Sequence, residues 1–375
     1  MFDSSKVLTA EVKDLGAVFA ANGFSLRVVG GAVRDLFLGK TPKDVDFATD
    51  ATPDEMISFL EADGRVVIPT GLQHGTISVL GSLDEPYEIT TLRIDTETDG
   101  RHAEVEFTRD FELDAARRDL TFNAMSMDMD GNVFDYFGGE KDLMNGTARF
   151  VGDAETRIQE DYLRILRFFR FQGRMKHVSI DQETWTAVWK NAKGLQKISG
   201  ERIWAELQKI LGSEHAEELL INMVETGTAE HASIPVDLAG FRKSMSTNPV
   251  ALLAALCGTQ ENVNVVVERM KPSAKERDLM TFLVNTNVGL EEAKVMSTDK
   301  VSKDFLVEMF LMKGDVNSAK EMQEFDVPEF PVLGRDLLAK GWTAGPHLGK
   351  KLKELKTKWV QSKFTLTKES LLDEN

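Results

Sequence analysis

The chain has 375 residues, 42% of them hydrophobic, which is enough for two or more compact units with their own cores. Its formal net charge of −16 argues against a generic nucleic-acid-binding protein, because phosphate binding depends on lysine and arginine, so any RNA contact must come from local basic patches. No apolar run approaches the roughly 18 residues of a membrane span, and the single cysteine, Cys257, excludes an internal disulfide and indicates a reducing compartment, which we expect to be the cytoplasm.

The first part of the chain has an α+β pattern. Charged residues interrupt the apolar positions of the N-terminal segment, which predicts an amphipathic helix and not a signal peptide. Short runs typical of strands then alternate with helices up to about residue 150. The predicted strands are Leu26–Val29, Val45–Ala48, Thr76–Leu80 and Tyr87–Thr91.

A glycine pair, Gly30 and Gly31, follows the first strand, and Asp44 and Asp46 open the second. Side chains two apart on a strand share one face, so we expect the two carboxylates to point together. Such a pair can hold two Mg²⁺ ions about 3.5 to 4 Å apart, which clamp the attacking and leaving oxygens of an in-line phosphoryl displacement. The glycines let the backbone approach a triphosphate closely.

Each of these features alone has an ordinary explanation, a solvated turn for Asp-x-Asp and a plain turn for Gly-Gly. Their joint order, with a strand, Gly-Gly, a short helix and then Asp-x-Asp, is much rarer and favours metal chemistry. A Walker A loop is excluded because Arg34 stands where its first glycine is needed, and no G-x-G-x-x-G is present. The arrangement resembles the nucleotidyltransferase superfamily.

Five later motifs follow in chain order, Glu88–Arg93, Asp99–Arg101, Arg117–Ala124, Asp135–Gly139 and Glu160–Arg164. Their order resembles that of class II tRNA nucleotidyltransferases, the CCA-adding enzymes and their poly(A) polymerase relatives. The resemblance weakens afterwards and returns near Gly334 to Leu352. The family implies an α+β fold, in which a nucleotidyltransferase-type head with a small mixed β-sheet and flanking helices precedes an all-α neck, body and tail.

The resemblance also implies roles for single residues. Arg117, Asp119 and Asn123 correspond to the motif that contacts the ribose and triphosphate of the incoming nucleotide, and we add Arg34 and Arg167 to the nucleotide-binding set. These assignments depend on the family, since Arg-Arg-Asp alone would be a solvated charge cluster.

Three further segments resemble family elements. Glu88 is a possible third acidic group near the metals, although an exposed strand glutamate is an equal alternative. The segment 93–109 resembles the flexible loop that helps the enzyme switch from C to A addition, with Asp99, Gly100 and Arg101 at its tip. The segment 201–206 resembles the motif that braces the neck through ion pairs and packing.

From Ala154 onward the apolar residues recur at helical spacing. Turn-rich breaks near Gly212, Ser246–Pro249 and Val327–Gly334 separate the helical segments. We predict a catalytic head over 1–152, a helical neck with a nucleotide-selecting motif over 153–212, a helical body over 213–330 and a helical, tRNA-binding tail over 331–375.

The sequence predicts a base-selecting pair in the neck. Asp161 and Arg164 are three apart on a predicted helix and share a face, with Arg157 one turn earlier on the same side. An arginine donor beside a carboxylate acceptor matches the N3 and N4 positions of cytosine and the N1 and N6 positions of adenine. Guanine and uracil would leave charged groups unpaired, at roughly 1 to 3 kcal/mol each, so CTP and ATP are preferred. The alternative is a surface ion pair on a helix.

The tail reverses the acidic balance of the chain. Between residues 340 and 363 its lysines face a single acid, Glu354. We predict that Lys350, Lys351, Lys353 and Lys356 bind tRNA phosphates, with a solvated helix face as the alternative.

Together these features predict an enzyme that adds CCA, or part of it, to tRNA 3′ ends from CTP and ATP at a site with two Mg²⁺ ions. The main alternative is an A-adding enzyme or poly(A) polymerase of the same family, although the segment 71–76 resembles the CCA branch and the basic segment of bacterial poly(A) polymerases is missing. A non-catalytic RNA-binding protein on this fold is disfavoured by the retained acidic and template residues. We expect no membrane association and no obligate protein partner.

Overall fold

The computed structural model describes residues 2–81, 86–98, 103–299 and 301–373. The chain divides into two compact units, an N-terminal unit of Met1–Val236 with Glu268–Pro272 and a C-terminal unit of Asp237–Val267 with Ser273–Asn375. The finer division into head, neck, body and tail stays a proposal. None of the helices within the described ranges combines the length and the apolar character that a membrane crossing requires.

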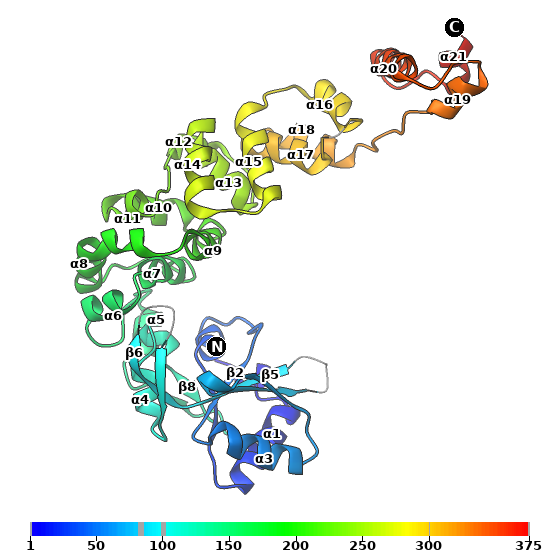
Figure 1. Cartoon of the computed structure of the whole chain (residues 1–375). Helices are drawn as coiled ribbons and strands as arrows, with labels where there is room; N and C mark the ends of the chain where they lie inside the picture. The colour runs from blue at the N-terminus through cyan, green and yellow to red at the C-terminus, as the bar shows by residue number, and fades with distance from the viewer. Residues whose placement is uncertain (1, 82–85, 99–102, 300, 374–375) are drawn as a thin grey trace. The chain divides into compact units, whose positions relative to one another are not determined.

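The N-terminal unit is built on a seven-stranded mixed sheet (Figure 1). Its strand order is β3-β4-β5-β2-β1-β8-β9, and neighbouring strands are antiparallel except β2 and β5, which run parallel. The four predicted strands are confirmed to within one residue. The strands are β1 Leu26–Val29, β2 Asp46–Thr49, β3 Val67–Gly71, β4 Thr76–Leu80, β5 Pro86–Thr91, β8 Ser126–Met127 and β9 Val133–Phe134, and a separate hairpin pairs β6 Arg93–Thr98 with β7 Ala103–Phe107.

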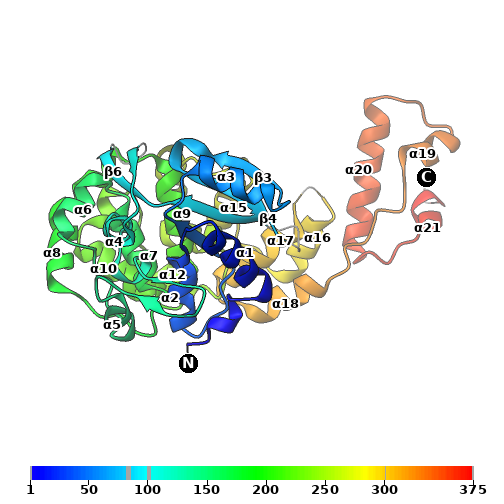
Figure 2. The same ribbon diagram turned by 90° about the horizontal axis from the view of Figure 1, so that it is seen from below.

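Helices α1 (Ala10–Ala21) and α3 (Pro53–Ala62) lie together on one face of this sheet (Figures 1 and 2). The start of α3 is encoded locally, because Thr52 and Glu55 cap each other's backbone N–H groups in a capping box and a proline occupies the first helical turn. The apolar side of each helix, including Phe19 and Leu60, is fully buried against the strands. The α+β prediction for this part of the chain is therefore confirmed.

The remaining helices of the N-terminal unit connect the sheet to a helical region. Helix α2 follows the glycine pair directly, and α7 and α9 pack against each other. The bounds are α2 Gly31–Phe37, α4 Phe111–Ala116, α5 Gly139–Met144, α6 Ala154–Glu160, α7 Arg164–Gln172, α8 Gln182–Asn191, α9 Gly200–Leu211, α10 Ala216–Glu225 and α11 Thr228–His231, with a short 3₁₀ turn, η3, at Thr121–Asn123.

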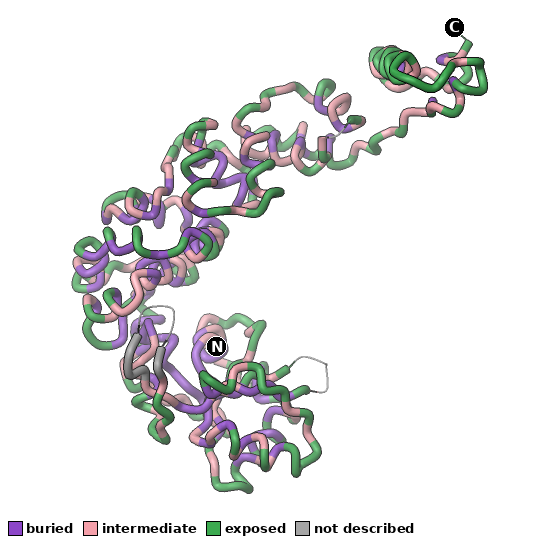
Figure 3. Tube along the Cα trace, in the orientation of Figure 1, coloured by how far each residue is buried: buried purple, intermediate pink, exposed green. Residues whose placement is uncertain are grey.

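The C-terminal unit is all-helical in the described ranges. Its central helix α13 buries every residue from Val250 to Cys257, a stretch that is continuous in Figure 3. Burial also raises the pKa of the Cys257 thiol to about 12, so the group stays protonated and serves in packing. The bounds are α12 Leu238–Lys243, α13 Pro249–Cys257, α14 Gln260–Met270, α15 Ala274–Asn285, α16 Leu290–Ser297, α17 Lys303–Met312, α18 Val316–Glu324, α19 Gly334–Ala339, α20 Pro346–Gln361 and α21 Lys368–Asp373. The last three residues of α14 belong to the N-terminal unit.

The last three helices have a small core of their own. Leu355 and Trp359 of α20 are buried with Val332, Leu337 and Leu371, and partly buried leucines of the same stripe pack against them. The apolar side of α20 is thus used for packing, which leaves the other side for solvent or a ligand.

Candidate active site

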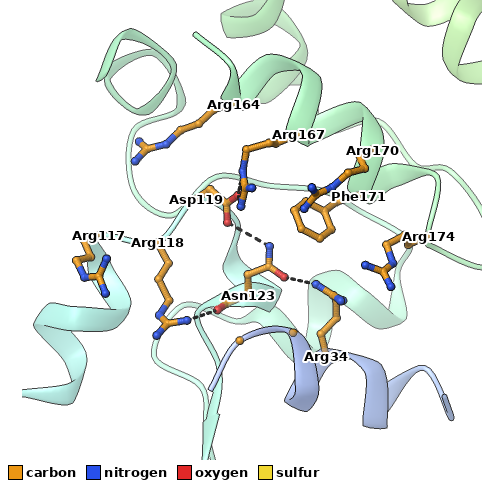
Figure 4. A pocket seen from close by; sticks show the side chains of 12 residues that line it. Arg34, Arg117, Arg118, Asp119, Asn123, Arg164, Arg167, Arg170, Phe171 and Arg174 are labelled. Atoms are coloured by element: carbon orange, nitrogen blue, oxygen red, sulfur yellow. Dashed lines mark hydrogen bonds and ion pairs between the residues drawn. The ribbon is translucent and has the colours of Figure 1, made fainter. Parts of the chain in front are cut away.

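A pocket of about 450 Å³ lies between the start of α2, the segment around η3 and helix α7 (Figure 4). Seven arginines face a single acidic residue in it, so it is suited to a ligand with several negative charges, such as a triphosphate. Its lining residues are Gly30, Gly31, Arg34, Arg117, Arg118, Asp119, Asn123, Arg164, Arg167, Arg170, Phe171 and Arg174.

A chain of hydrogen bonds crosses the floor of this pocket. Arg34 Nη1 donates to Asn123 Oδ1 at 2.7 Å, and Asn123 Nδ2 donates to Asp119 Oδ1 at 3.1 Å. The other carboxylate oxygen of Asp119 accepts from Arg167 Nε at 2.7 Å. Residues of α2, η3 and α7 are therefore held in one fixed arrangement (Figure 4).

The charge of Asp119 is stabilised although its side chain is buried. Burial alone would raise the pKa of Asp119, but the Arg167 guanidinium and the hydrogen bonds from Asn123 and the Leu120 amide outweigh it, so the pKa lies below its usual value. Asp119 therefore stays ionised and fixes Arg167 at the pocket.

Gly30 is required where Arg118 approaches the backbone. Gly30 has a φ of 64°, in the region that favours glycine, and a Cβ there would lie 2.9 Å from Arg118 Nη1. The same nitrogen donates to the Asn123 carbonyl at 3.5 Å. A larger residue would strain the backbone and displace this guanidinium.

Of the two predicted catalytic acids, Asp46 is the first residue of β2, whereas Asp44 lies two residues before the strand and not on it as expected. Asp46 stands opposite Val29, the residue before Gly30, and opposite Glu88 of the parallel strand β5. Partial desolvation and the carboxylates of Glu88 and Asp44 raise the pKa of Asp46, against the lowering effect of Arg118. Negative charge is therefore concentrated at the start of the central strand β2.

The corner between α6 and α7 differs from the prediction. We expected Asp161 and Arg164 on one face of a single helix, but α6 ends at Glu160, Asp161 is extended at φ −152° and ψ 105°, and α7 begins at Arg164. Asp161 accepts from the Leu163 amide at 3.0 Å and from Arg202 Nη2 of α9 at 2.7 Å. The prediction of a shared helical face was wrong, because these contacts of the Asp161 carboxylate replace the helical continuation.

Arg164 and Arg157 meet at Glu160 instead. Arg157 Nη1 lies 2.9 Å from a carboxylate oxygen of Glu160, which also forms an ion pair with Arg164, and Arg164 Nη1 donates to the Arg157 carbonyl at 2.9 Å. Arg164 lines the pocket, whereas Arg157 and Asp161 are not among its lining residues.

Helix α9 braces α7 through buried charges, as the sequence predicted. Glu206 Oε1 accepts from Arg170 Nη1 at 2.9 Å, and Arg202 holds Asp161. Burial lowers the pKa of Arg170 to about 10, an effect that Glu206 opposes. Arg170 remains protonated at neutral pH and contributes its charge to the pocket.

The structure adds four pocket residues that the sequence reasoning missed. They are Arg118, Arg170, Phe171 and Arg174. Arg170 and Phe171 follow Arg164 and Arg167 along α7 at intervals of three or four residues, and Arg174 comes just after the end of the helix; Figure 4 shows Arg164, Arg167 and Arg170 projecting from α7. This spacing of arginines was the available signal.

The loop tip with Asp99, Gly100 and Arg101 lies outside the described residues, between β6 and β7. The tail lysines belong to α20 in the C-terminal unit, where Lys350 and Lys353 are exposed. Lys351 lies 3.4 Å from Glu354, and Lys356 forms an ion pair with Asp299.

Comparison with known proteins supports this geometry. Residues 26–149 match the family model described as the poly A polymerase head domain, and residues 177–233 match the probable RNA and SrmB-binding site of polymerase A. The mitochondrial CCA tRNA nucleotidyltransferase 1 of Danio rerio is 43% identical over 96% of this chain and 88% of its own length, and that of Homo sapiens is 42% identical over 98% and 90%.

A solved structure agrees with these matches. The crystal structure of the Bacillus stearothermophilus CCA-adding enzyme in complex with CTP is similar to this chain with a TM-score of 0.72 at 28% identity, covering 95% of this chain and 94% of that one. The chain therefore belongs to the family of CCA-adding enzymes and poly(A) polymerases.

Proposed function

We propose that this chain is a CCA tRNA nucleotidyltransferase, which adds C and A nucleotides from CTP and ATP to the 3′ end of tRNA without a nucleic-acid template. The observation that carries the proposal is the pocket with seven arginines beside the acidic pair, since Asp46 faces the residue that precedes Gly30. Relatives that match nearly the whole chain are named as CCA tRNA nucleotidyltransferases, which favours this function over poly(A) polymerisation.

In the proposed reaction the 3′-hydroxyl oxygen of the tRNA bonds to the α-phosphorus of the nucleotide, the bond from that phosphorus to the bridging oxygen breaks, and pyrophosphate leaves. The protein contributes mainly positioning and charge stabilisation. Arg34 and Arg167 would bind the triphosphate in orientations already fixed by Asn123 and Asp119. Because these donors are preorganised, little reorganisation is needed when negative charge develops.

We further propose that Asp44 and Asp46 hold two Mg²⁺ ions, with Glu88 close to them. Carboxylate oxygens are ligands that Mg²⁺ prefers, and a cation would offset the burial and the carboxylate repulsion that raise the pKa of Asp46. Within the described ranges no three acidic, histidine or cysteine side chains form a metal-binding group, so water and substrate phosphates would complete the coordination. A bound ion would neutralise charge on the reacting phosphate oxygens.

The proposal is tested with a tRNA that ends at the discriminator base. We expect CTP alone to give two added C residues, CTP with ATP to give CCA, and ATP alone to give no efficient addition, as read by sequencing the 3′ ends. Addition of A only to tRNA that already ends in CC would identify an A-adding enzyme, and long A tails would identify a poly(A) polymerase.

A first prediction concerns nucleotide choice. Asp161→Ala and Arg164→Ala should each relax discrimination against UTP and GTP by about tenfold or more, because the penalty for unpaired charged groups disappears with the correct contact. The measurement is kcat/KM for the four nucleotides. Glu155→Ala, at the other end of α6 from this corner, is the control. An unchanged nucleotide ranking combined with lower stability would make the pair structural.

A second prediction concerns the tail. Replacing Lys350 and Lys353 by glutamine should weaken tRNA binding and lower the slope of log K against log salt by about 0.7 to 0.9 for each lost phosphate contact. These two side chains are exposed, whereas Lys351 and Lys356 have internal partners. The double variant Lys275→Gln and Lys320→Gln, also exposed in the C-terminal unit, is the control. Equal slopes for both variants would assign the tail a structural role.

The compartment stays a prediction. Relatives of Danio rerio and Homo sapiens are named as mitochondrial, whereas the sequence composition led us to expect the cytoplasm. Fractionation of cells that express the native protein, followed by immunodetection, distinguishes the two.

A further inference from the structure

A second basic pocket lies next to the arginine-lined pocket, which is called the nucleotide pocket from here on. The proposed reaction gives this second pocket no role. Its volume is about 790 Å³, and it shares Arg170 and Arg174 with the nucleotide pocket. Six basic side chains face one carboxylate, that of Glu214, in a protein whose net charge is −16. The basic residues are Lys40, Lys43, Arg170, Arg174, Lys176 and Lys209.

Several of these lysines have no internal partner. In the part of the chain that the structure describes, no hydrogen bond or ion pair engages the ammonium groups of Lys40, Lys43 and Lys176. The ammonium group of Lys209 has a single, long contact, 3.5 Å from the Glu206 carboxylate. The Nε atom of Arg170 is also buried without a partner among the described residues. Arg170 pairs with Glu206 at 2.9 Å and Arg174 with Asp35 at 3.7 Å, so the uncompensated positive charge of the pocket is that of its lysines.

Helix ends alone do not account for this charge. Lysines near the C-termini of α7 and α9 would stabilise the helix dipoles, which explains Lys176 and Lys209. Lys40 and Lys43, however, come from the segment between α2 and β2, and Lys43 directly precedes Asp44. Three separate segments of the N-terminal unit thus bring cations to one place beside the catalytic acids.

We propose that this pocket binds the phosphodiester backbone of the 3′-terminal strand of the RNA substrate, an inference that rests on the proposed function. Nucleotidyl transfer brings two polyanions together, and the arginine-lined pocket already suits the triphosphate. Lysine is a compact, flexible point charge that contacts a phosphate backbone without requiring one geometry, whereas arginine suits bidentate recognition. The shared wall of Arg170 and Arg174 would keep the two substrates adjacent.

The test uses the full chain with Lys40, Lys176 and Lys209 replaced by glutamine. These side chains are exposed and lie outside the nucleotide pocket, so the variant should fold. The matched control replaces Lys13, Lys141 and Lys271, which are exposed in the same unit; Lys271 lies 3.6 Å from Glu201, a contact like that of Lys209. Thermal unfolding of both proteins checks the fold.

Two RNA probes distinguish the ligand. One is a tRNA transcript that ends at the discriminator base, and the other carries uncharged methylphosphonates at its last three internucleotide linkages. We expect the wild-type protein to bind the modified RNA about tenfold or more weakly than the unmodified RNA. The triple variant should bind the unmodified RNA with an affinity reduced by a similar factor. The modification should then lower the affinity of the triple variant little further, because the contacts are already lost. The control variant should behave like the wild type.

Other results overturn the proposal. If the triple variant discriminates between the two RNAs as strongly as the wild type does, the pocket does not contact those phosphates. If RNA binding is unchanged while inhibition by inorganic pyrophosphate or the KM for CTP changes, the pocket serves the free polyphosphate. Nucleotide incorporation by the wild-type preparation is measured in parallel, so failure of the proposed function is recognised separately.

Discussion

Replacing Asp44 or Asp46 by alanine should reduce incorporation of both CTP and ATP on the order of 10³-fold or more, because charge stabilisation common to every addition is lost. Asp46 opens the central strand β2 opposite Glu88, and neither aspartate lines the arginine-lined pocket or the second basic pocket. The affinity for tRNA should therefore change by less than about twofold. Single-turnover incorporation at saturating Mg²⁺ measures the effect, and Glu61→Ala, an exposed acid of α3, is the control.

Asp46→Asn separates this effect from unfolding. Because the pKa of Asp46 is raised in the folded protein, the ionised carboxylate lowers the free energy of unfolding at a pH above that pKa. Asp46→Asn removes this charge, so the melting temperature at neutral pH should stay unchanged or rise. Mg²⁺ should raise the melting temperature of the wild type but not that of the variant. Comparable turnover by variant and wild type would remove both aspartates from the mechanism.

Local signals account for the parts of the fold that the sequence predicted well. The first strand, the glycine pair and the helix after it are set by residues close in sequence, and Thr52 with Glu55 marks the start of α3. The placement of Glu88 opposite Asp46 needed the sheet order, in which β2 and β5 are parallel neighbours although several elements separate them in the chain. Periodicity alone contains no such information.

The corner at Asp161 shows why part of the site was mispredicted. No proline or glycine interrupts the helical pattern there, so the sequence favoured one continuous helix. The chain bends because Asp161 binds the Leu163 amide and, through tertiary structure, Arg202 of α9. A distant partner overrides local propensity here.

The largest effect on stability is expected from Asp119→Ala. Asp119 is only 8% exposed and connects Arg167, Asn123 and the Leu120 amide. Its removal leaves Arg167 without its counterion, which for a fully buried pair costs about 3 to 5 kcal/mol. Because Arg167 is partly exposed, we expect the free energy of unfolding of the N-terminal unit to fall by about 2 to 4 kcal/mol. Urea denaturation measures the difference.

The pH dependence and a double variant test the cause of that loss. Folding lowers the pKa of Asp119, so the ionised carboxylate contributes fully to the free energy of unfolding above the unfolded carboxyl pKa of about 3.9. This contribution decreases as the pH falls through the pKa of Asp119 in the folded protein. The free energies of unfolding of wild type and variant should therefore converge in acid. Arg167→Ala alone should also destabilise the protein, and the double variant should lose less than the sum of the two single losses. The two side chains are not coupled if the losses of unfolding free energy are strictly additive, or if the difference between wild type and Asp119→Ala does not depend on pH. The fixed orientation of Arg167 at the nucleotide pocket would then need another origin.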